Sequence, residues 1–78
     1  MHSVVLYTKS GCCLCDGAKD ALALARRRVE FALHEVDIES DPAIFARHRY
    51  DIPVIEVDGR RAFKHCVTAD ELVQRLTR

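Results

Sequence analysis

Apolar residues recur along this chain with two different spacings, and the change between them predicts where strands and helices lie. Residues Ser3 to Thr8 are nearly continuously apolar at their centre, which is typical of a strand covered on both faces. From Leu14 to about Arg28 the apolar positions follow helical spacing. A second strand pattern spans Phe31 to Ile38. Strand, helix and strand of these lengths predict a right-handed βαβ unit with a parallel strand pair.

Turn signals divide the middle of the chain into further short elements. Asp41 before Pro42 fits an N-cap followed by proline at the first helical position. This pair predicts a short helix through about Arg49, and we expect Ile44 and Phe45 to face inward. The helix carries no obvious chemistry of its own.

The last third of the chain predicts a hairpin and a helix. The connection Asp58-Gly59-Arg60 joins the strand patterns Val54–Val57 and Arg61–Lys64, and its Asp-Gly step favours an antiparallel pair. Thr68 and Glu71 match a capping box that opens a final amphipathic helix. The predicted fold class is therefore α/β, in the order βαβαββα, with a four-stranded mixed sheet flanked by helices in one domain over residues 1–78. This order is the layout of a minimal thioredoxin fold.

Length and charge narrow the range of functions. A chain of 78 residues has room for one modest core, so an active site must lie at the surface. Twelve basic and twelve acidic side chains cancel, and no net field attracts nucleic acid or an anionic membrane. The apolar runs are too short for a signal peptide or a membrane span. We expect a cytoplasmic monomer with no nucleic-acid or membrane partner.

Four cysteines in a reducing compartment point to redox chemistry or metal binding rather than to structural disulfides. Cys12 and Cys15 form a CxxC pair where the first strand gives way to the first helix. Unpaired amides and the helix dipole stabilise a thiolate at that position. Two cysteines three residues apart at a helix start share one side, at a separation that suits a disulfide. We expect Cys12 to attack a substrate disulfide and Cys15 to resolve the mixed disulfide.

The other two cysteines carry less information. Cys13 points to a different side of the first turn, and we interpret it as a spectator, with an oxidation site or auxiliary thiol as alternatives. Cys66 follows the last strand, and we interpret it as buried or incidental. A rival hypothesis is a metal or iron–sulfur module that uses Cys12, Cys13 and Cys15. A closed structural zinc site usually combines two paired ligand motifs, and this chain has one, so we expect no metal site.

Two segments resemble the glutaredoxin family. Tyr7 to Cys15 is similar to its active-site segment, which has a tyrosine, a nearby basic residue and a CxxC after the first strand. Ile52-Pro53, followed by Val54 to Gly59, is similar to its cis-proline strand and hairpin. The resemblance covers nearly the whole chain and is strongest to small bacterial glutaredoxin-like proteins with a leucine before the second cysteine. It implies that Pro53 is cis and faces the CxxC pair, and that Ile52 offers backbone groups to an extended substrate.

The function that we predict is a small dithiol thiol-disulfide oxidoreductase acting on protein or low-molecular-weight disulfides, with no resident cofactor. Lys9, three residues before Cys12, either supports the thiolate or a substrate carboxylate, or is a solvated surface lysine. The residues predicted to bind substrate are Lys9, Cys13, Leu14, Ile52 and Pro53.

The electron donor stays open. Typical glutaredoxins have Pro-Tyr between the cysteines and a Gly-Gly pair before the last helix. This chain has Cys13-Leu14 at the first place and Phe63 to Val67 at the second. Glutathione is therefore only one candidate reductant.

Overall fold

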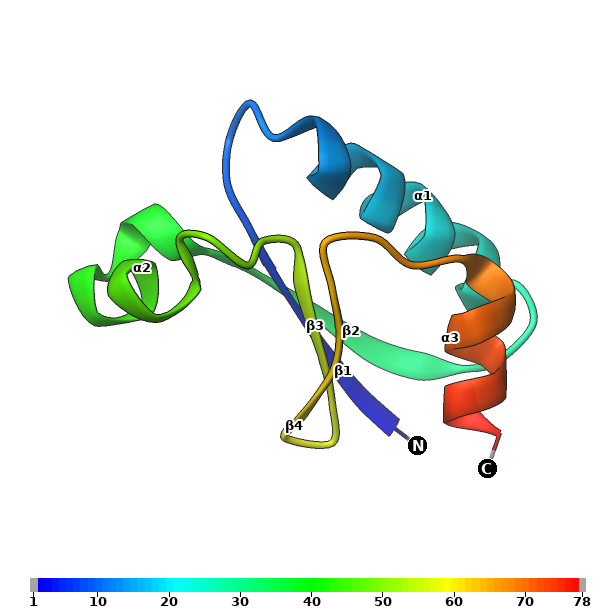
Figure 1. Cartoon of the computed structure of the whole chain (residues 1–78). Coiled ribbons are helices and arrows are strands. Elements are labelled where there is room, and N and C mark those ends of the chain that lie inside the picture. The colour runs from blue at the N-terminus through cyan, green and yellow to red at the C-terminus, as the bar shows by residue number, and fades with distance from the viewer. Residues whose placement is uncertain (1, 78) are drawn as a thin grey trace.

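The predicted order of strands and helices is confirmed. The computed structural model describes residues 2–77, with the backbone alone at Cys13. Figure 1 shows the elements along the chain. They are β1 (His2–Thr8), α1 (Cys13–Arg26), β2 (Phe31–Asp37), a 3-10 turn η1 (Ile38–Ser40), α2 (Pro42–His48), β3 (Val54–Val57), β4 (Arg60–Lys64) and α3 (Ala69–Leu76).

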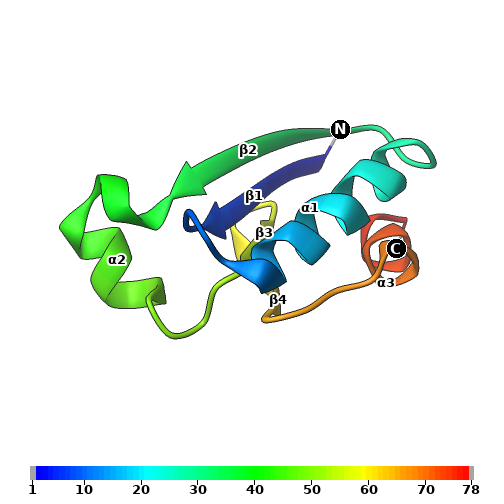
Figure 2. The same cartoon turned by 90° about the horizontal axis from the view of Figure 1, so that it is seen from above.

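The four strands form one mixed sheet in the order β2-β1-β3-β4. β1 runs parallel to β2 and antiparallel to β3, and β4 returns antiparallel beside β3. α1 and α3 lie together on one side of the sheet, whereas α2 stands at the other side (Figures 1 and 2). β1 is therefore a central strand, and its carboxyl end leads directly into the loop before α1.

The main core lies between the sheet and the pair α1 and α3. Along β1 the buried residues Val4, Leu6 and Thr8 alternate with the half-buried Val5 and Tyr7. This period of two directs one set of side chains toward α1 and the other toward α2. The face of β1 that carries Val5 and Tyr7 is thus only partly covered, whereas the continuous apolar run predicts a strand buried on both faces. The core cluster comprises Val4, Leu6, Ala18, Ala21, Leu22, Ala25, Phe31, Ile55, Val57, Leu72 and Leu76.

Local hydrogen bonds explain the ends of the elements. α1 stops at Arg26 rather than Arg28, because the amides of Arg27 and Arg28 bond to carbonyls three residues back and tighten the last turn. The hairpin turn needs only two residues, since Asp58 and Gly59 both adopt a positive φ. β4 consequently begins at the residue after Gly59, one earlier than predicted.

The ends of the remaining helices follow their caps. Asp41 accepts the amide of Ala43 at the start of α2. The predicted capping box is present at α3, where Thr68 accepts the Glu71 amide and the Glu71 carboxylate bonds back to Thr68.

α2 buries a residue that the apolar pattern does not indicate. Ile44 and Phe45 are only half-buried, whereas His48 is 2% exposed. The His48 ring stacks on Tyr7 with the ring centroids 4.3 Å apart, and the Tyr7 hydroxyl donates to Glu56. The expectation that Ile44 and Phe45 face inward is therefore only partly met, because Tyr7 projects from the sheet where the last turn of α2 arrives.

The buried imidazole makes stability depend on pH. Burial, together with the charges of Arg47 and Arg61, lowers the pKa of His48. A lowered pKa means that folding favours the neutral ring, so its contribution is complete above the unfolded value of about 6.5 and is lost as the pH falls below it. We predict that the wild-type protein loses stability relative to His48→Phe on acidification from about pH 6.5.

Urea unfolding of both proteins across this range provides the measurement. All other ionisable groups are the same in both proteins, so the difference between the two curves isolates His48. Curves that run parallel through the acidic range would contradict the prediction.

Candidate active site

The loop between β1 and α1 places Cys12 at the N-terminus of helix α1. Gly11 takes a φ of +80°, a conformation that a residue with a side chain adopts only under strain. The amide of Cys12 then donates to the carbonyl of Lys9, with the nitrogen and oxygen 3.3 Å apart. This tight turn brings the chain from the end of the central strand to the N-cap of α1, where Cys12 is extended and half-exposed.

Cys12 is the N-cap of α1 through its sulfur atom. The Cys15 amide donates to Cys12 Sγ at 3.3 Å, which satisfies one of the unpaired amides at the helix start. N-caps are usually oxygen acceptors such as serine or aspartate. The reactive sulfur atom is thus also the atom that caps the helix.

Cys15 lies one turn further on, in a different environment. Its side chain is 1% exposed, and burial together with the hydrogen bond to Cys12 raises the pKa of its thiol. The Thr8 hydroxyl and the Lys9 amide act in the opposite direction. One thiol of the pair is therefore half-exposed, whereas the other is buried in an environment that disfavours its ionised form.

The segment that contains Pro53 lies at the same end of the sheet as the start of α1 (Figures 1 and 2). The Ile52–Pro53 peptide bond is cis, and the Pro53 side chain is buried. The Pro53 carbonyl accepts the His65 amide at 2.9 Å, which ties this segment to the end of β4. Ile52 itself is half-buried.

The remaining predicted residues differ in exposure. Leu14 is 54% exposed and Lys9 is also exposed, while the side chain of Cys13 lies outside the described part of the structure. The interpretation of Cys66 as buried or incidental is wrong on burial, since its side chain is exposed. That it is incidental stays a prediction. His65 takes a φ of +69°, and the Cys66 amide turns back to the Lys64 carbonyl, so Cys66 points outward after β4.

Thr8 is a residue of this region that the motifs did not single out. It is the last residue of β1, is 9% exposed, and acts on the Cys15 thiol. Its placement follows from strand alternation, because it has the same parity as the core residues Val4 and Leu6.

The charged residues of α1 and α3 form a separate contact. Arg28, just beyond the end of α1, pairs with Asp70 in the first turn of α3 at 2.6 Å. Both side chains are exposed, and such pairs contribute little to stability.

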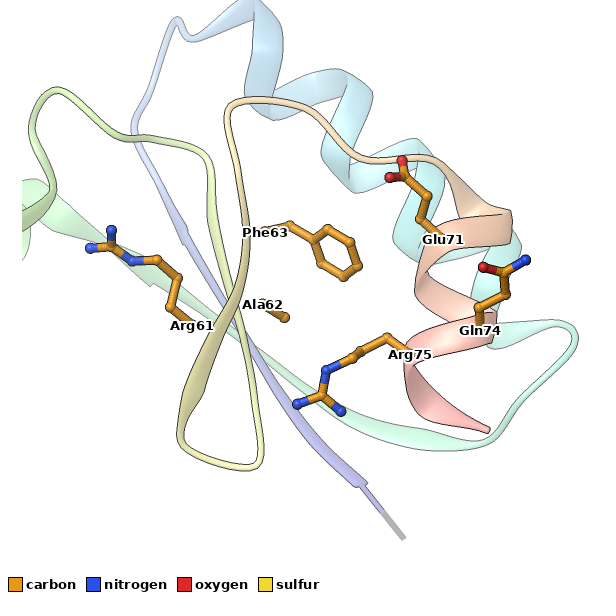
Figure 3. Close-up of a pocket in the computed structure, with 6 residues that line it drawn as sticks. All are labelled: Arg61, Ala62, Phe63, Glu71, Gln74 and Arg75. Atoms are coloured by element: carbon orange, nitrogen blue, oxygen red, sulfur yellow. The ribbon is translucent and has the colours of Figure 1, made fainter. Parts of the chain in front are cut away.

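A hollow of about 340 Å³ lies between β4 and α3 (Figure 3). Phe63 points toward α3 within it, whereas Arg61 points away from the helix. The other lining residues are Ala62, Glu71, Gln74 and Arg75, and none of the predicted site residues is among them.

Two structural features bear on function classes. Across the described side chains, which leave out Cys13, no three histidine, cysteine or acidic groups come together in a way that could hold a metal ion. No helix between residues 2 and 77 is long and apolar enough to cross a membrane.

Comparison with known proteins identifies the family. The family described as "Glutaredoxin-like domain (DUF836)" matches residues 3–77. The chain belongs to this glutaredoxin-like family. A curated relative, the "Glutaredoxin-like protein YDR286C homolog" of Dictyostelium discoideum, is 30% identical over 76 residues, which cover 90% of this chain and 70% of the relative.

Solved structures of similar proteins confirm the fold of this glutaredoxin-like protein. Structural genomics target protein XcR50 of X. campestris shares 31% identity with a TM-score of 0.80, and 95% of each chain is covered. Desulfothioredoxin from Desulfovibrio vulgaris Hildenborough shares 24% identity with a TM-score of 0.72, over 97% of this chain and 78% of that one. The expected minimal thioredoxin fold is therefore present, and its Cys12–Cys15 pair is consistent with a redox role.

The unequal environments of the cysteines predict an order of alkylation. With limiting iodoacetamide at neutral pH, we expect the reduced glutaredoxin-like protein to be modified at Cys12 well before Cys15. The exposed Cys66 serves as an internal reference. Since burial raises the pKa of Cys15, its alkylation should also require a higher pH than that of Cys66.

Fragment-ion mass spectrometry of the digested protein reads the order directly. Cys15 reacting as fast as Cys66 at neutral pH would contradict the assignment of a sheltered thiol.

Proposed function

We propose that this protein is a small dithiol thiol-disulfide oxidoreductase in which Cys12 and Cys15 form the redox pair. The observation that supports it most is the pairing of an accessible sulfur at a helix N-cap with a buried thiol one turn later, joined by the Cys15 amide. This combination supplies an attacking group and a resolving group on one rigid helix turn.

The reaction proceeds in two exchanges. The Cys12 thiolate attacks one sulfur of a substrate disulfide, forms a mixed disulfide and releases the other substrate sulfur as a thiolate, which takes a proton from solvent. Cys15 then attacks Cys12 Sγ, so that the bond between Cys12 and the substrate breaks and the second substrate thiol leaves. The substrate disulfide gains two electrons and the enzyme dithiol loses two.

Exposed apolar side chains near the redox pair offer contacts for the substrate, which we propose is a protein or small-molecule disulfide. Leu14 lies between the two cysteines at 54% exposure. Tyr50, 79% exposed, lies close to the Ile52–Pro53 segment, and its carbonyl oxygen is 3.3 Å from the His65 ring. Exposed apolar groups at a site are frequent contacts for a partner. We propose that the substrate lies across this end of the molecule, against Lys9, Cys13, Leu14, Ile52 and Pro53.

Regeneration of the dithiol needs a reductant of the thiol or dithiol class. Glutathione is one candidate, although Leu14 stands where typical glutaredoxins have tyrosine. We propose that the protein works in the cytoplasm as a monomer and holds no resident cofactor or metal.

The Cys15→Ser variant provides the test, because it removes the resolving thiol and keeps the attacking one. We predict that this variant, mixed anaerobically with a disulfide-containing model protein such as insulin, accumulates a mixed disulfide through Cys12, whereas the wild-type protein does not. Non-reducing electrophoresis and mass spectrometry measure the adduct, and dithiothreitol should release it.

The matched control is the double variant Cys12→Ser with Cys15→Ser, which should form no adduct by this route. Metal content and the absorption spectrum of the same anaerobic preparation test the rival cluster hypothesis. A missing Cys12 adduct together with a stoichiometric coloured cluster would refute the oxidoreductase proposal.

A further inference from the structure

Thr8 places a hydroxyl in the core beneath the site. It is 9% exposed and follows Val4 and Leu6 on the face of β1 that packs toward α1. Within the described part of the chain, its Oγ1 atom is buried and has no hydrogen-bond partner of standard geometry. A buried hydroxyl without a partner destabilises the fold, so this position calls for a reason beyond packing.

Thr8 ends β1 on the face that packs toward α1, and Cys15 is buried in the first turn of that helix. The Cys15 thiol is the titratable group on which the Thr8 hydroxyl acts. Thr8 Oγ1 is near enough to lower the pKa of that thiol, as the Lys9 amide does, although burial outweighs both and raises it. A neutral thiol is a weak acceptor, which explains why no standard hydrogen bond forms in the resting state. A thiolate at the same place would be a strong acceptor.

The resolving step requires Cys15 to ionise to a thiolate, and its buried position disfavours that charge. Cys15 is 1% exposed, so water does not solvate the charge that must form there. Among the described residues, the one titratable group that acts on this thiol is Cys12, and it opposes ionisation. Once Cys12 is bound in a mixed disulfide its sulfur is uncharged. The donors that remain for the Cys15 thiolate are the Thr8 hydroxyl and the Lys9 amide.

We propose that Thr8 donates a hydrogen bond from Oγ1 to the Cys15 thiolate and thereby sets the rate of the resolving step. This inference rests on the proposed oxidoreductase function. In the step, the Cys15 thiol gives its proton to water, the thiolate attacks Cys12 Sγ, and the Cys12–Cys15 bond forms as the bond from Cys12 to the substrate sulfur breaks. The departing sulfur carries the electron pair and takes up a proton. Thr8 itself is neither oxidised nor deprotonated.

A chromogenic aromatic disulfide, 5,5′-dithiobis(2-nitrobenzoate), separates the two exchanges. In a protein that carries Cys13→Ser and Cys66→Ser, attack by Cys12 releases one coloured thiolate in a phase that depends on reagent concentration. Attack by Cys15 releases the second coloured thiolate in a phase whose rate is independent of reagent concentration. Stopped-flow absorbance measures both phases as a function of pH.

Thr8→Val removes the hydroxyl and keeps the shape of the side chain. We predict an unchanged first phase, a second phase slowed by about tenfold at neutral pH, and a midpoint of its pH profile raised by about one unit, as expected for the loss of a hydrogen bond to a charged group. Thr8→Ser, which keeps the hydroxyl and loses the methyl group, should restore the rate and the midpoint. Thr8→Ala should behave as Thr8→Val does, and it replaces that variant if the valine protein does not fold.

The controls distinguish the failure of this inference from the failure of the function. A packing role alone predicts the reverse order, with Thr8→Val neutral and Thr8→Ser impaired. An unchanged second phase in both Thr8→Val and Thr8→Ala, with the second phase abolished in Cys15→Ser, would overturn the role of Thr8 and leave the oxidoreductase proposal intact. A second phase that persists in Cys15→Ser would overturn the oxidoreductase proposal, and the role of Thr8 with it.

Discussion

The hydrogen bond from the Cys15 amide to Cys12 Sγ is the contact on which the site depends. A helix start leaves amides without partners, and in this protein a sulfur atom satisfies one of them. The same atom therefore caps the helix and presents the accessible thiol. Any reaction that changes the charge or bonding of Cys12 also changes the cap of α1, so the chemistry and the local structure are coupled at a single atom.

The sheet explains why the two cysteines differ although they are three residues apart. β1 is central, and its end delivers the chain to the N-cap through a turn at Gly11. From there α1 packs along the core, so that the position one turn in is covered while the cap position stays half-exposed. Burial raises the pKa of Cys15 and leaves Thr8 and the Lys9 amide as the groups that favour its ionised form.

Much of this structure follows from local sequence signals, whereas several site details do not. The apolar run of β1, the helical spacing in α1 and the Asp-Gly turn each act over a few residues, and the order of the elements was predictable from them, as were the parallel pair β1–β2 and the antiparallel pair β3–β4. The antiparallel pairing of β1 with β3 was not predicted, because it joins strands that are distant in the sequence. The burial of His48 was not, because it depends on where Tyr7 meets α2. The exposure of Cys66 depends on the unusual φ of His65, which its sequence position does not reveal. The effect of Thr8 on the Cys15 thiol likewise depends on packing between two elements, β1 and α1.

In the function that we propose, Cys12 and Cys15 exchange between a dithiol and a disulfide. The most direct measurement uses the variant Cys13→Ser with Cys66→Ser, which keeps only these two cysteines. Its reduced form is treated with a small disulfide, the remaining thiols are alkylated, and the mass of the intact protein is recorded. We expect the loss of both thiols within one molecule and their return on addition of dithiothreitol. Two thiols that both remain open to alkylation would contradict it.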